Sequence, residues 1–323
     1  MAGGGRLSEV FVYPIKSCKG ISVKAARVTK TGFKFDRQWM VVDQEKMRFI
    51  SQRNHPKLAR VNVELPPNAC TIAPGEEGAE AAMVVSAPEL MERPIYIPLQ
   101  RKLGSVVGQA RVWEWTGDVV DEGDGAAEWF SELLGAKCRL VRFSGFRNTE
   151  EAYAPDNETA FADGFPFLVT SKESLEAVNA QSGIDFPMNR FRPNVVVEKC
   201  GGAFDEDYWS AIEVKRGHSA QNSAQDSSSS DPACCFTLVK PCSRCKVTTV
   251  NQATGTVDGK EPLQSLTAIH SGSKAGFTNK RTFANVPLFG WNAICGPDML
   301  GRIVHSGSSV EVTERRQSLS DFT

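Results

Sequence analysis

The chain opens its regular pattern with the stretch LSEVFVY (residues 7–13), which we interpret as a period-two strand pattern. A period of two is typical of a strand that buries one of its faces. The same alternation, bounded by Gly, Pro and Asn, recurs at residues 21–28, 38–42, 60–65, 95–99 and 111–115. We therefore expect the first third of the chain to be mostly β-structure.

Two helices are expected between the strands. The first begins with Asp124 as its N-cap and ends before Gly135. The second begins with a capping box formed by Thr170 and Glu173 and ends before Gly183. Both glycines suit the left-handed backbone conformation of the residue that ends a helix.

Strands resume in the second half of the chain, at residues 194–197, 235–240, 246–250 and 309–313. Between them, residues 217–232 are rich in Ser, Gln, Asn and Asp and cannot bury enough apolar surface to become ordered, so we expect a disordered surface insertion. The fold class is therefore mainly β with a few helices (α+β). We expect one β-rich domain at residues 6–150 and a second at residues 151–316.

The composition is that of a soluble globular protein: 323 residues, 41% hydrophobic, 23% charged, with a formal net charge of −1. This charge does not suggest binding to nucleic acid or to an anionic membrane. We expect no transmembrane segment, since no apolar stretch is long enough to span a bilayer, and no signal peptide precedes the first strand. The odd number of cysteines lacks the spacing of a disulfide framework, so we expect reduced thiols in an intracellular compartment, cytoplasmic or mitochondrial. The cysteines are residues 18, 70, 138, 200, 234, 235, 242, 245 and 295.

The motif CSRC at residues 242–245 is the most informative chemical feature, and four interpretations compete for it. A thioredoxin-like site would need a helix after the motif, whereas residues 246–250 are β-branched. A zinc site recruiting Cys234 and Cys235 is disfavoured, because adjacent cysteines fit the usual pair of separated knuckles poorly. One thiolate could instead be the sole protein ligand of a soft metal carried by a cofactor, with Arg244 stabilising the sulfur. Taken alone, the motif favours the fourth interpretation, two cysteines buried as small hydrophobic side chains.

Basic residues elsewhere in the chain give this motif a context. Lys16 and Ser17 end the first strand shortly before Gly20, which permits unusual backbone angles. Pro193 restricts the backbone and presents the preceding arginine at the start of a strand. If these cations gather in the fold, they would form a phosphate clamp, because guanidinium groups match phosphate oxygens bidentately. The cations are Lys16, Arg37, Arg190, Arg192 and Arg244.

Several common enzyme classes are disfavoured by the remaining residues. The four histidines lie far apart in sequence and no serine stands in a nucleophile elbow, which argues against hydrolases and zinc proteases. Residues 118–125 lack the regular acidic ligands of a calcium loop. No Gly-x-Gly-x-x-Gly fingerprint follows a strand, so a nicotinamide cofactor would have to be oxidised on another protein.

Four separated motifs, in this order, resemble the MOSC-domain family over nearly the whole chain: YPIKSC (13–18), FADGFP (161–166), NRFRPN (189–194) and CSRC (242–245). Within that family the chain is most similar to the mitochondrial amidoxime-reducing components. The resemblance implies an N-terminal β-rich MOSC-associated domain and a C-terminal MOSC β-barrel. It also implies that a molybdenum cofactor (Mo-molybdopterin) lies between the two.

The resemblance further implies which residues meet the metal. Cys245, the second cysteine of the motif, would be the molybdenum ligand, and Cys242 would be structural. Asp163 would lie beside the metal, where it could orient a solvent ligand or relay protons. Residues 287–292 would form a loop that closes over the cofactor. The residues implied in cofactor binding are Lys16, Ser17, Arg37, Gly164, Phe165, Arg190, Arg192, Ser243, Arg244 and Asn292.

The activity implied by the resemblance is molybdenum-dependent reduction of N-hydroxylated compounds such as amidoximes and hydroxylamines, extending to reduction of nitrite to nitric oxide. Electrons would come from NADH through cytochrome b5 reductase and cytochrome b5. Two alternatives remain open. MOSC domains also form part of molybdenum-cofactor sulfurases, so the chain could be a cofactor carrier or sulfur-transfer module. It could also be a regulatory or scaffold β-protein without a cofactor.

Overall fold

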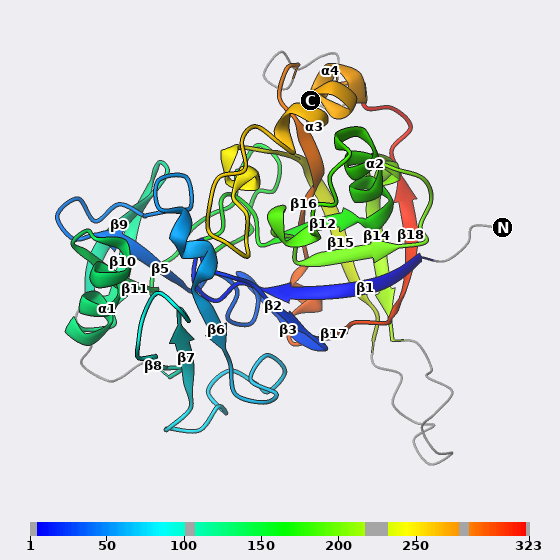
Figure 1. Ribbon diagram of the computed structural model, residues 1–323. Helices are drawn as coiled ribbons and strands as arrows, with labels where there is room; N and C mark the ends of the chain where they lie inside the picture. The colour runs from blue at the N-terminus through cyan, green and yellow to red at the C-terminus, as the bar shows by residue number, and fades with distance from the viewer. Residues whose placement is uncertain (1–4, 101–106, 217–231, 278–283, 321–323) are drawn as a thin grey trace.

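A β-barrel dominates the structure, a computed structural model that describes residues 5–100, 107–216, 232–277 and 284–320 (Figure 1). Among these residues an eight-stranded sheet has β1 paired with β13 as well, so that seven strands close into a barrel and β2 extends from β1. The expected class, mainly β with a few helices, is confirmed. In sheet order the strands are β13 (Val195–Glu198), β12 (Phe167–Ser171), β16 (Leu288–Ile294), β15 (Cys234–Ser243), β14 (Trp209–Lys215), β18 (Ser309–Arg315), β1 (Gly5–Val12) and β2 (Ile21–Val23).

The barrel closes through a strand from the very start of the chain. β1 runs antiparallel to β13, with Val10 opposite Val195 and a register shift after Leu7. The three consecutive valines of β13 are all buried because both faces of the strand are covered. Val195 and Val197 join the main core, whereas Val196 joins a smaller cluster beneath the helices α2 and α3.

Three smaller sheets lie beside the barrel. The largest, at the left of Figure 1, carries the helix α1 against β11 and has the strand order β5-β11-β10-β9. Its strands are β5 (Trp39–Asp43), β11 (Cys138–Phe143), β10 (Trp115–Asp121) and β9 (Val107–Val112). The other two sheets comprise β17 (Ile303–His305) with β3 (Ala25–Thr29) and β4 (Gly32–Phe33), and β6 (Asn62–Glu64) with β7 (Ala82–Ser86) and β8 (Ile95–Pro98).

Both expected helices are present, but each begins at a different cap from the one predicted. Gly123 is the N-cap of α1, and Asp124 lies in its first turn. Ser171, not Thr170, caps α2, because its side chain accepts a hydrogen bond from the amide of Ser174. Both helices end at a left-handed glycine, as predicted. The helices are α1 (Asp124–Leu134), α2 (Lys172–Ser182), α3 (Leu263–His270) and α4 (Gly272–Ala275), and the 3-10 turns are η1 (Pro56–Arg60), η2 (Met188–Arg190), η3 (Asp205–Tyr208), η4 (Lys246–Thr249) and η5 (Pro297–Met299).

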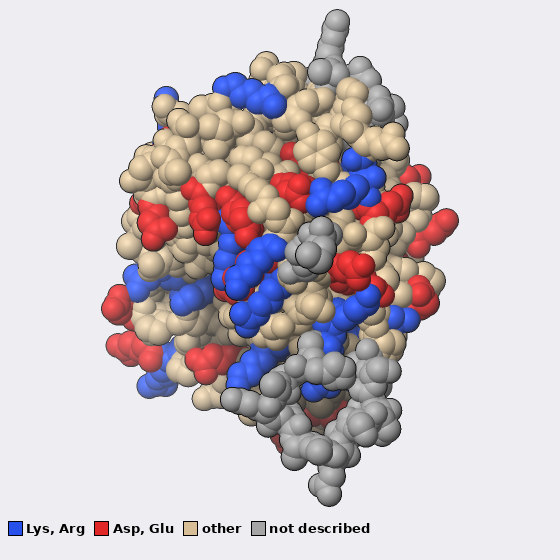
Figure 2. Space-filling view, turned by 90° about the vertical axis from the view of Figure 1, so that its right-hand side faces the viewer, with Lys and Arg blue, Asp and Glu red and all other residues tan. Residues whose placement is uncertain are grey.

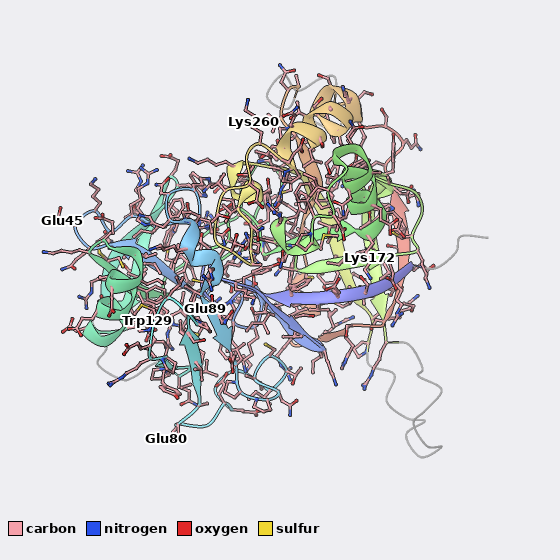
Figure 3. All side chains as sticks on the ribbon, viewed as in Figure 1. Glu45, Glu80, Glu89, Trp129, Lys172 and Lys260 are labelled. Atoms are coloured by element: carbon pink, nitrogen blue, oxygen red, sulfur yellow. The ribbon has the colours of Figure 1, made fainter. Side chains whose placement is uncertain are left out.

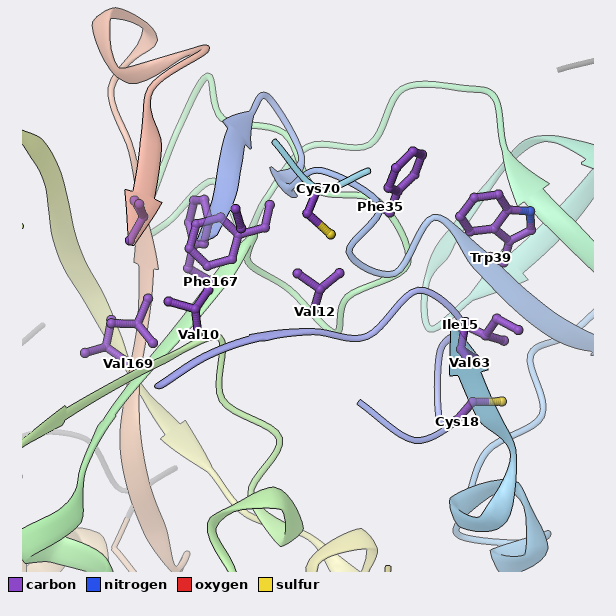
Figure 4. Packing of buried hydrophobic residues seen from close by; sticks show 14 of the residues in the cluster. Val10, Val12, Ile15, Cys18, Phe35, Trp39, Val63, Cys70, Phe167 and Val169 are labelled. Carbon is purple, nitrogen blue, oxygen red and sulfur yellow. The ribbon is translucent and has the colours of Figure 1, made fainter. Parts of the chain in front are cut away.

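The hydrophobic core is continuous from the barrel into the neighbouring sheets. Val10 and Val12 of β1 belong to the same buried cluster as Phe167 on β12 and Trp39 on β5 (Figure 4). The chain that follows β1 therefore leaves the barrel core and enters the core of the adjoining sheets. This continuity fixes the position of residues 13–18 at the junction.

The face of the barrel beside β18 and β14 carries charges of both signs, which are interspersed (Figure 2). Lys215 lies 2.6 Å from Glu213 and 2.9 Å from Glu311, and Arg315 pairs with Asp205. Such exposed pairs contribute little to stability but keep a sheet face solvated. The predicted insertion at residues 217–232 falls, apart from its last residue, outside the described residues. No described helix combines the length and apolar character needed to cross a membrane.

Candidate functional site

A cleft of about 830 Å³, counting its open mouth, lies where the turn after β1, the 160–166 loop and the end of β15 meet. Eleven of the twelve residues that the sequence singles out line it: Lys16, Ser17, Arg37, Asp163, Gly164, Phe165, Arg192, Ser243, Arg244, Cys245 and Asn292. The fold therefore brings together motifs that lie more than two hundred positions apart.

Cys245 occupies the start of a 3-10 turn, so the strand expected at residues 246–250 is wrong. Thr248 donates from both its amide and its hydroxyl to the carbonyl of Cys245, and the Thr249 hydroxyl donates to that of Lys246. These local hydrogen bonds compete with strand pairing and outweigh the β-propensity of the threonines. Cys245 therefore precedes a turn and not a strand, and the half-buried Cys245 thiol lines the cleft.

A guanidinium group that the sequence did not single out contacts the Cys245 sulfur. Nη2 of Arg53 donates to Cys245 Sγ at 3.1 Å, and the same guanidinium lies 4.8 Å from the ring centre of Trp113. Trp113 has a φ of 53° in the turn between β9 and β10, so the single strand expected at residues 111–115 is instead a hairpin corner. Arg244, which we expected to stabilise that sulfur, donates to Cys242 Sγ at 2.9 Å.

Two cleft arginines lie against the same buried ring. The guanidinium groups of Arg37 and Arg192 lie 4.2 Å and 4.4 Å from the centre of the Tyr13 ring. Arg37 is further held by the Asp36 carboxylate and donates to the carbonyl of Arg192 at 3.0 Å. Burial raises the pKa of Tyr13 to about 12, so its hydroxyl stays neutral beside the two cations.

The backbone at three cleft residues adopts the left-handed conformation without glycine. Ser17, Arg37 and Arg192 have φ values of 68°, 48° and 57°. Such angles are uncommon for side-chain-bearing residues and persist only where the surroundings enforce them. The presence of three such residues in one cleft makes it a candidate functional site.

Buried nitrogen atoms in the cleft lack acceptors among the described residues. Arg192 Nη2 and Arg244 Nε are both buried with no hydrogen-bond partner there. The cleft is lined by five cations against the single carboxylate of Asp163. An excess of positive charge with unsatisfied donors suits an anionic ligand such as a phosphate. The cations are Lys16, Arg37, Arg53, Arg192 and Arg244.

Lys16 and Asp163 form an ion pair at the edge of the cleft. Lys16 Nζ lies 2.6 Å from Asp163 Oδ1 and donates to the carbonyl of Phe161 at 2.7 Å. Burial lowers the pKa of Lys16 to about 8, although the Asp163 charge opposes the shift. Desolvation acts to raise the pKa of Asp163, but the nearby Lys16 outweighs it and holds that pKa well below the usual range. The carboxyl is therefore ionised, whereas the ammonium can release a proton near neutral pH.

Arg147, which the sequence analysis did not select, holds the loop that carries Asp163. Its side chain is buried and donates to the carbonyls of Ala160, Ala162 and Asp163 at 2.7 Å, 2.5 Å and 2.7 Å. One guanidinium thus satisfies three carbonyl groups of irregular backbone. Neither Arg147 nor Arg53 stands in a local motif that would have pointed to it. The partner of Arg53 is distant in sequence, and the partners of Arg147 are carbonyls of irregular backbone.

Arg190 is the one candidate that does not line the cleft. Its buried guanidinium donates to the carbonyl of Thr249 at 3.2 Å and to Asp258 at 2.6 Å. Arg190 ends the turn η2, whereas Arg192 follows the turn with a left-handed φ of 57°. Arg190 therefore anchors η4 from behind instead of joining the expected phosphate clamp.

Asn292 reaches the cleft from a strand and not from the expected loop. It lies in β16, pairs with Leu168 of β12 and donates to the carbonyl of Lys240 at 3.3 Å. The sequence does not clearly predict a strand at residues 288–294, because Gly290 interrupts the pattern. In the structure Gly290 has a φ of 72° within β16.

The zinc and thioredoxin interpretations of the CSRC motif do not fit this geometry. Cys235 and Cys242 stand seven positions apart on β15, and at about 3.3 Å per residue that places them roughly 20 Å apart. Among the described residues no three His, Cys, Asp or Glu side chains gather as a metal site. The motif is followed by a single 3-10 turn, too short to supply the helix dipole of a thioredoxin site.

Comparison with known proteins agrees with the resemblance. The MOSC N-terminal beta barrel domain matches residues 4–137, and the MOSC domain matches residues 156–315. The mitochondrial amidoxime reducing component 2 of Rattus norvegicus is 32% identical over 305 residues, covering 88% of this chain and 78% of the relative. The mitochondrial amidoxime-reducing component 1 of Mus musculus is 28% identical over 302 residues, covering 88% and 76%, and that of Homo sapiens is 26% identical, covering 88% and 77%. This chain belongs to the MOSC-domain family, together with the mitochondrial amidoxime-reducing components.

Proposed function

We propose that this chain is a molybdenum-cofactor-dependent reductase of N-hydroxylated compounds, among them amidoximes and hydroxylamines, and that it also reduces nitrite to nitric oxide. The observation that carries the proposal is the position of Cys245. Its sulfur lines a cleft that five cations also line, and two buried arginine nitrogens of that cleft lack an acceptor among the described residues. Soft sulfur beside an anion-binding surface is the donor set expected of a metal that arrives on an organic phosphate.

The residues present fit a molybdenum–pterin group. Cys245 would supply the protein thiolate to the metal, and Arg192 and Arg244 would direct their unpartnered nitrogens at the phosphate. Ser17 would present its backbone and hydroxyl from a left-handed turn, which lets the chain approach a ligand closely. When bound, the cofactor supplies oxygen-atom transfer chemistry.

The chain itself can deliver a proton to the reaction. Reduction of an N-hydroxyl group to the amine consumes two electrons and two protons and releases water. Lys16 Nζ, with a pKa of about 8, holds a transferable proton 2.6 Å from Asp163. Asp163, held as a carboxylate, orients that ammonium and any water at the mouth of the cleft.

The electrons would come from another protein, cytochrome b5, which is reduced by NADH through cytochrome b5 reductase. The sequence holds no dinucleotide fingerprint that would bind NADH directly. The names of the relatives, which are amidoxime-reducing components, support the reductase activity and say nothing of the electron donor.

A reconstituted assay tests the proposal. The protein is purified from cells that make the cofactor and given benzamidoxime, NADH, cytochrome b5 and the reductase. We expect benzamidine to form in step with NADH consumption and only when all components are present. A protein that forms no benzamidine, yet restores a molybdenum-free acceptor enzyme by giving up its pterin, would be a carrier, and the reductase proposal would fail.

A further inference from the structure

A second, larger hollow lies beside the cleft, on the other face of η4. This groove has a volume of about 1540 Å³, counting its open mouth, and lies between the segment around Arg53, the turn η4 and the helix α3. Its floor includes the buried Val250, and its rim includes Val257, whose side chain is 57% exposed. An apolar surface left open next to a candidate active site suggests a ligand that covers it.

The groove and the cleft share walls. Arg53 lines both hollows, and its guanidinium contacts the Cys245 sulfur. The residues of η4 are divided between the two hollows: Val247 and Thr248 line the cleft, whereas Lys246 and Thr249 line the groove. A ligand lying in the groove would therefore contact the same guanidinium that contacts the Cys245 sulfur.

The charges around the groove have one sign. Arg53, Lys246 and Lys260 line it, and no Asp or Glu does so among the described residues. Asp258 is close in sequence, but its carboxylate accepts from Arg190 and Asn251.

Lys260 lines the groove near the start of α3. It precedes α3, as Figure 3 shows, and its ammonium makes no ion pair within the described part of the chain. Glu261, its neighbour, accepts from the amide of Ser265 and so caps the start of α3. An unpaired cation beside exposed apolar surface suits a ligand that is apolar along its length and anionic at one end.

We infer that the groove holds the organic body of the N-hydroxylated substrate and selects aromatic compounds that carry an anionic group at the end remote from the N-hydroxyl. The inference rests on the proposed reductase function. In this arrangement the aromatic body covers Val250, Val257 and Leu263, the anionic end meets Lys260, and the N-hydroxyl end crosses Arg53 to the cleft.

Three substrates of graded length and charge test this inference on the holoenzyme: benzamidoxime, biphenyl-4-amidoxime and 4′-carboxybiphenyl-4-amidoxime. In the wild type we expect KM to fall in that order. Lys260→Glu should raise KM for the carboxylate roughly three- to tenfold, as expected for reversing one partly exposed charge, and leave the two neutral substrates unchanged. Val257→Asp should raise KM for both biphenyl compounds and spare benzamidoxime.

Both substituted positions are exposed, so neither change threatens the fold. Lys24→Glu, an exposed lysine that does not line the groove, is the matched control and should alter no KM. Equal KM values for the three substrates in the wild type, or equal effects of Lys260→Glu on all of them, would overturn the inference while leaving the reductase proposal standing.

A binding measurement separates this inference from the proposed reaction. Biphenyl-4-carboxylate has no N-hydroxyl group and cannot turn over, so its affinity reports on the groove alone. We expect calorimetry to show binding that Lys260→Glu weakens and Lys24→Glu does not. If this binding is seen but no amidoxime is reduced, the reductase proposal fails and the groove remains an aromatic anion site. If biphenyl-4-carboxylate does not bind, the groove inference fails.

Discussion

Arg53 Nη2 lies 3.1 Å from Cys245 Sγ, although the two residues are 192 positions apart in the chain. The same guanidinium stacks on Trp113, which in turn donates to Asp163 at 3.2 Å. The sulfur and the carboxylate of the cleft are therefore linked through two side chains from the first half of the sequence. This contact makes Arg53 a positioning residue for Cys245.

Replacement of Arg53 by Ala should lower turnover about ten- to a hundredfold, the range expected for losing one hydrogen bond to a charged group. Molybdenum content should stay near that of the wild type, because Arg53 contacts the sulfur and not the expected phosphate site. Steady-state kinetics and metal analysis on the same sample measure both. Arg53→Lys keeps the charge, so its turnover should lie between those of the wild type and Arg53→Ala. Loss of metal in proportion to turnover would show that Arg53 retains the cofactor instead.

Replacement of Arg192 by Gln should weaken retention of the pterin. Arg192 Nη2 is buried without a partner among the described residues, so its loss removes a donor that a phosphate would satisfy. The expected effect is about 1.5–3 kcal/mol, as for a charge-assisted hydrogen bond. The pterin content after gel filtration, compared with that of the wild type, measures the effect. Full retention would mean that the phosphate binds elsewhere.

The control for this change is Arg190→Gln, only two positions away. Arg190 is bound to Asp258 and to the η4 carbonyls, so its loss should lower the free energy of unfolding by about 1–3 kcal/mol. The folded fraction should still retain pterin like the wild type. Urea unfolding combined with pterin analysis distinguishes the two arginines.

Asp163→Asn should move the alkaline limb of the pH–rate profile to lower pH. In the wild type the proton on Lys16 is lost as the pH rises through about 8, so turnover that uses this proton should decline there. The Asp163 charge raises the pKa of Lys16 against the effect of burial, and removing it lets that pKa fall further. Values of kcat/KM from pH 6 to 10 test this. A limb that stays in place or moves upward would exclude Lys16 as the proton source.

Glu206→Gln should make stability less dependent on pH. Glu206 is fully buried, and burial, with the neighbouring Asp207 charge, raises its pKa to about 7. A raised folded pKa favours folding fully below the unfolded value near 4.5, and this contribution is lost as the pH rises through about 7. Relative to wild type, the variant should therefore gain up to about 3 kcal/mol between pH 5 and pH 8, measured by urea unfolding. Glu176→Gln, an exposed change on α2, should show no such gain.

Site residues that stand in the separated motifs could be predicted, because each motif is a short run of characteristic residues that can be identified from the sequence alone. Lys16, Arg192 and Cys245 belong to such motifs, and the fold places all three in one cleft. Arg53 was missed because its role arises from a contact across 192 positions, for which the local sequence carries no signal.

The strand errors have local physical causes. Thr248 and Thr249 have high β-propensity, but their hydroxyls bond to nearby carbonyls and form a 3-10 turn. The alternation at residues 111–115 crosses a hairpin corner at Trp113, where a positive φ breaks the strand. The domain division at residues 150 and 151 stays a prediction; β1 comes first in the chain yet completes the barrel.

The most direct test of the account compares molybdenum and pterin content, and amidoxime turnover, in wild type, Cys245→Ala and Cys242→Ala produced in cells that make the cofactor. Both cysteines line the cleft and each sulfur accepts from one arginine, so they form a matched pair. We predict that Cys245→Ala loses turnover and most of its molybdenum, whereas Cys242→Ala keeps both. A Cys245→Ala protein that still holds molybdenum and reduces the amidoxime would contradict the account.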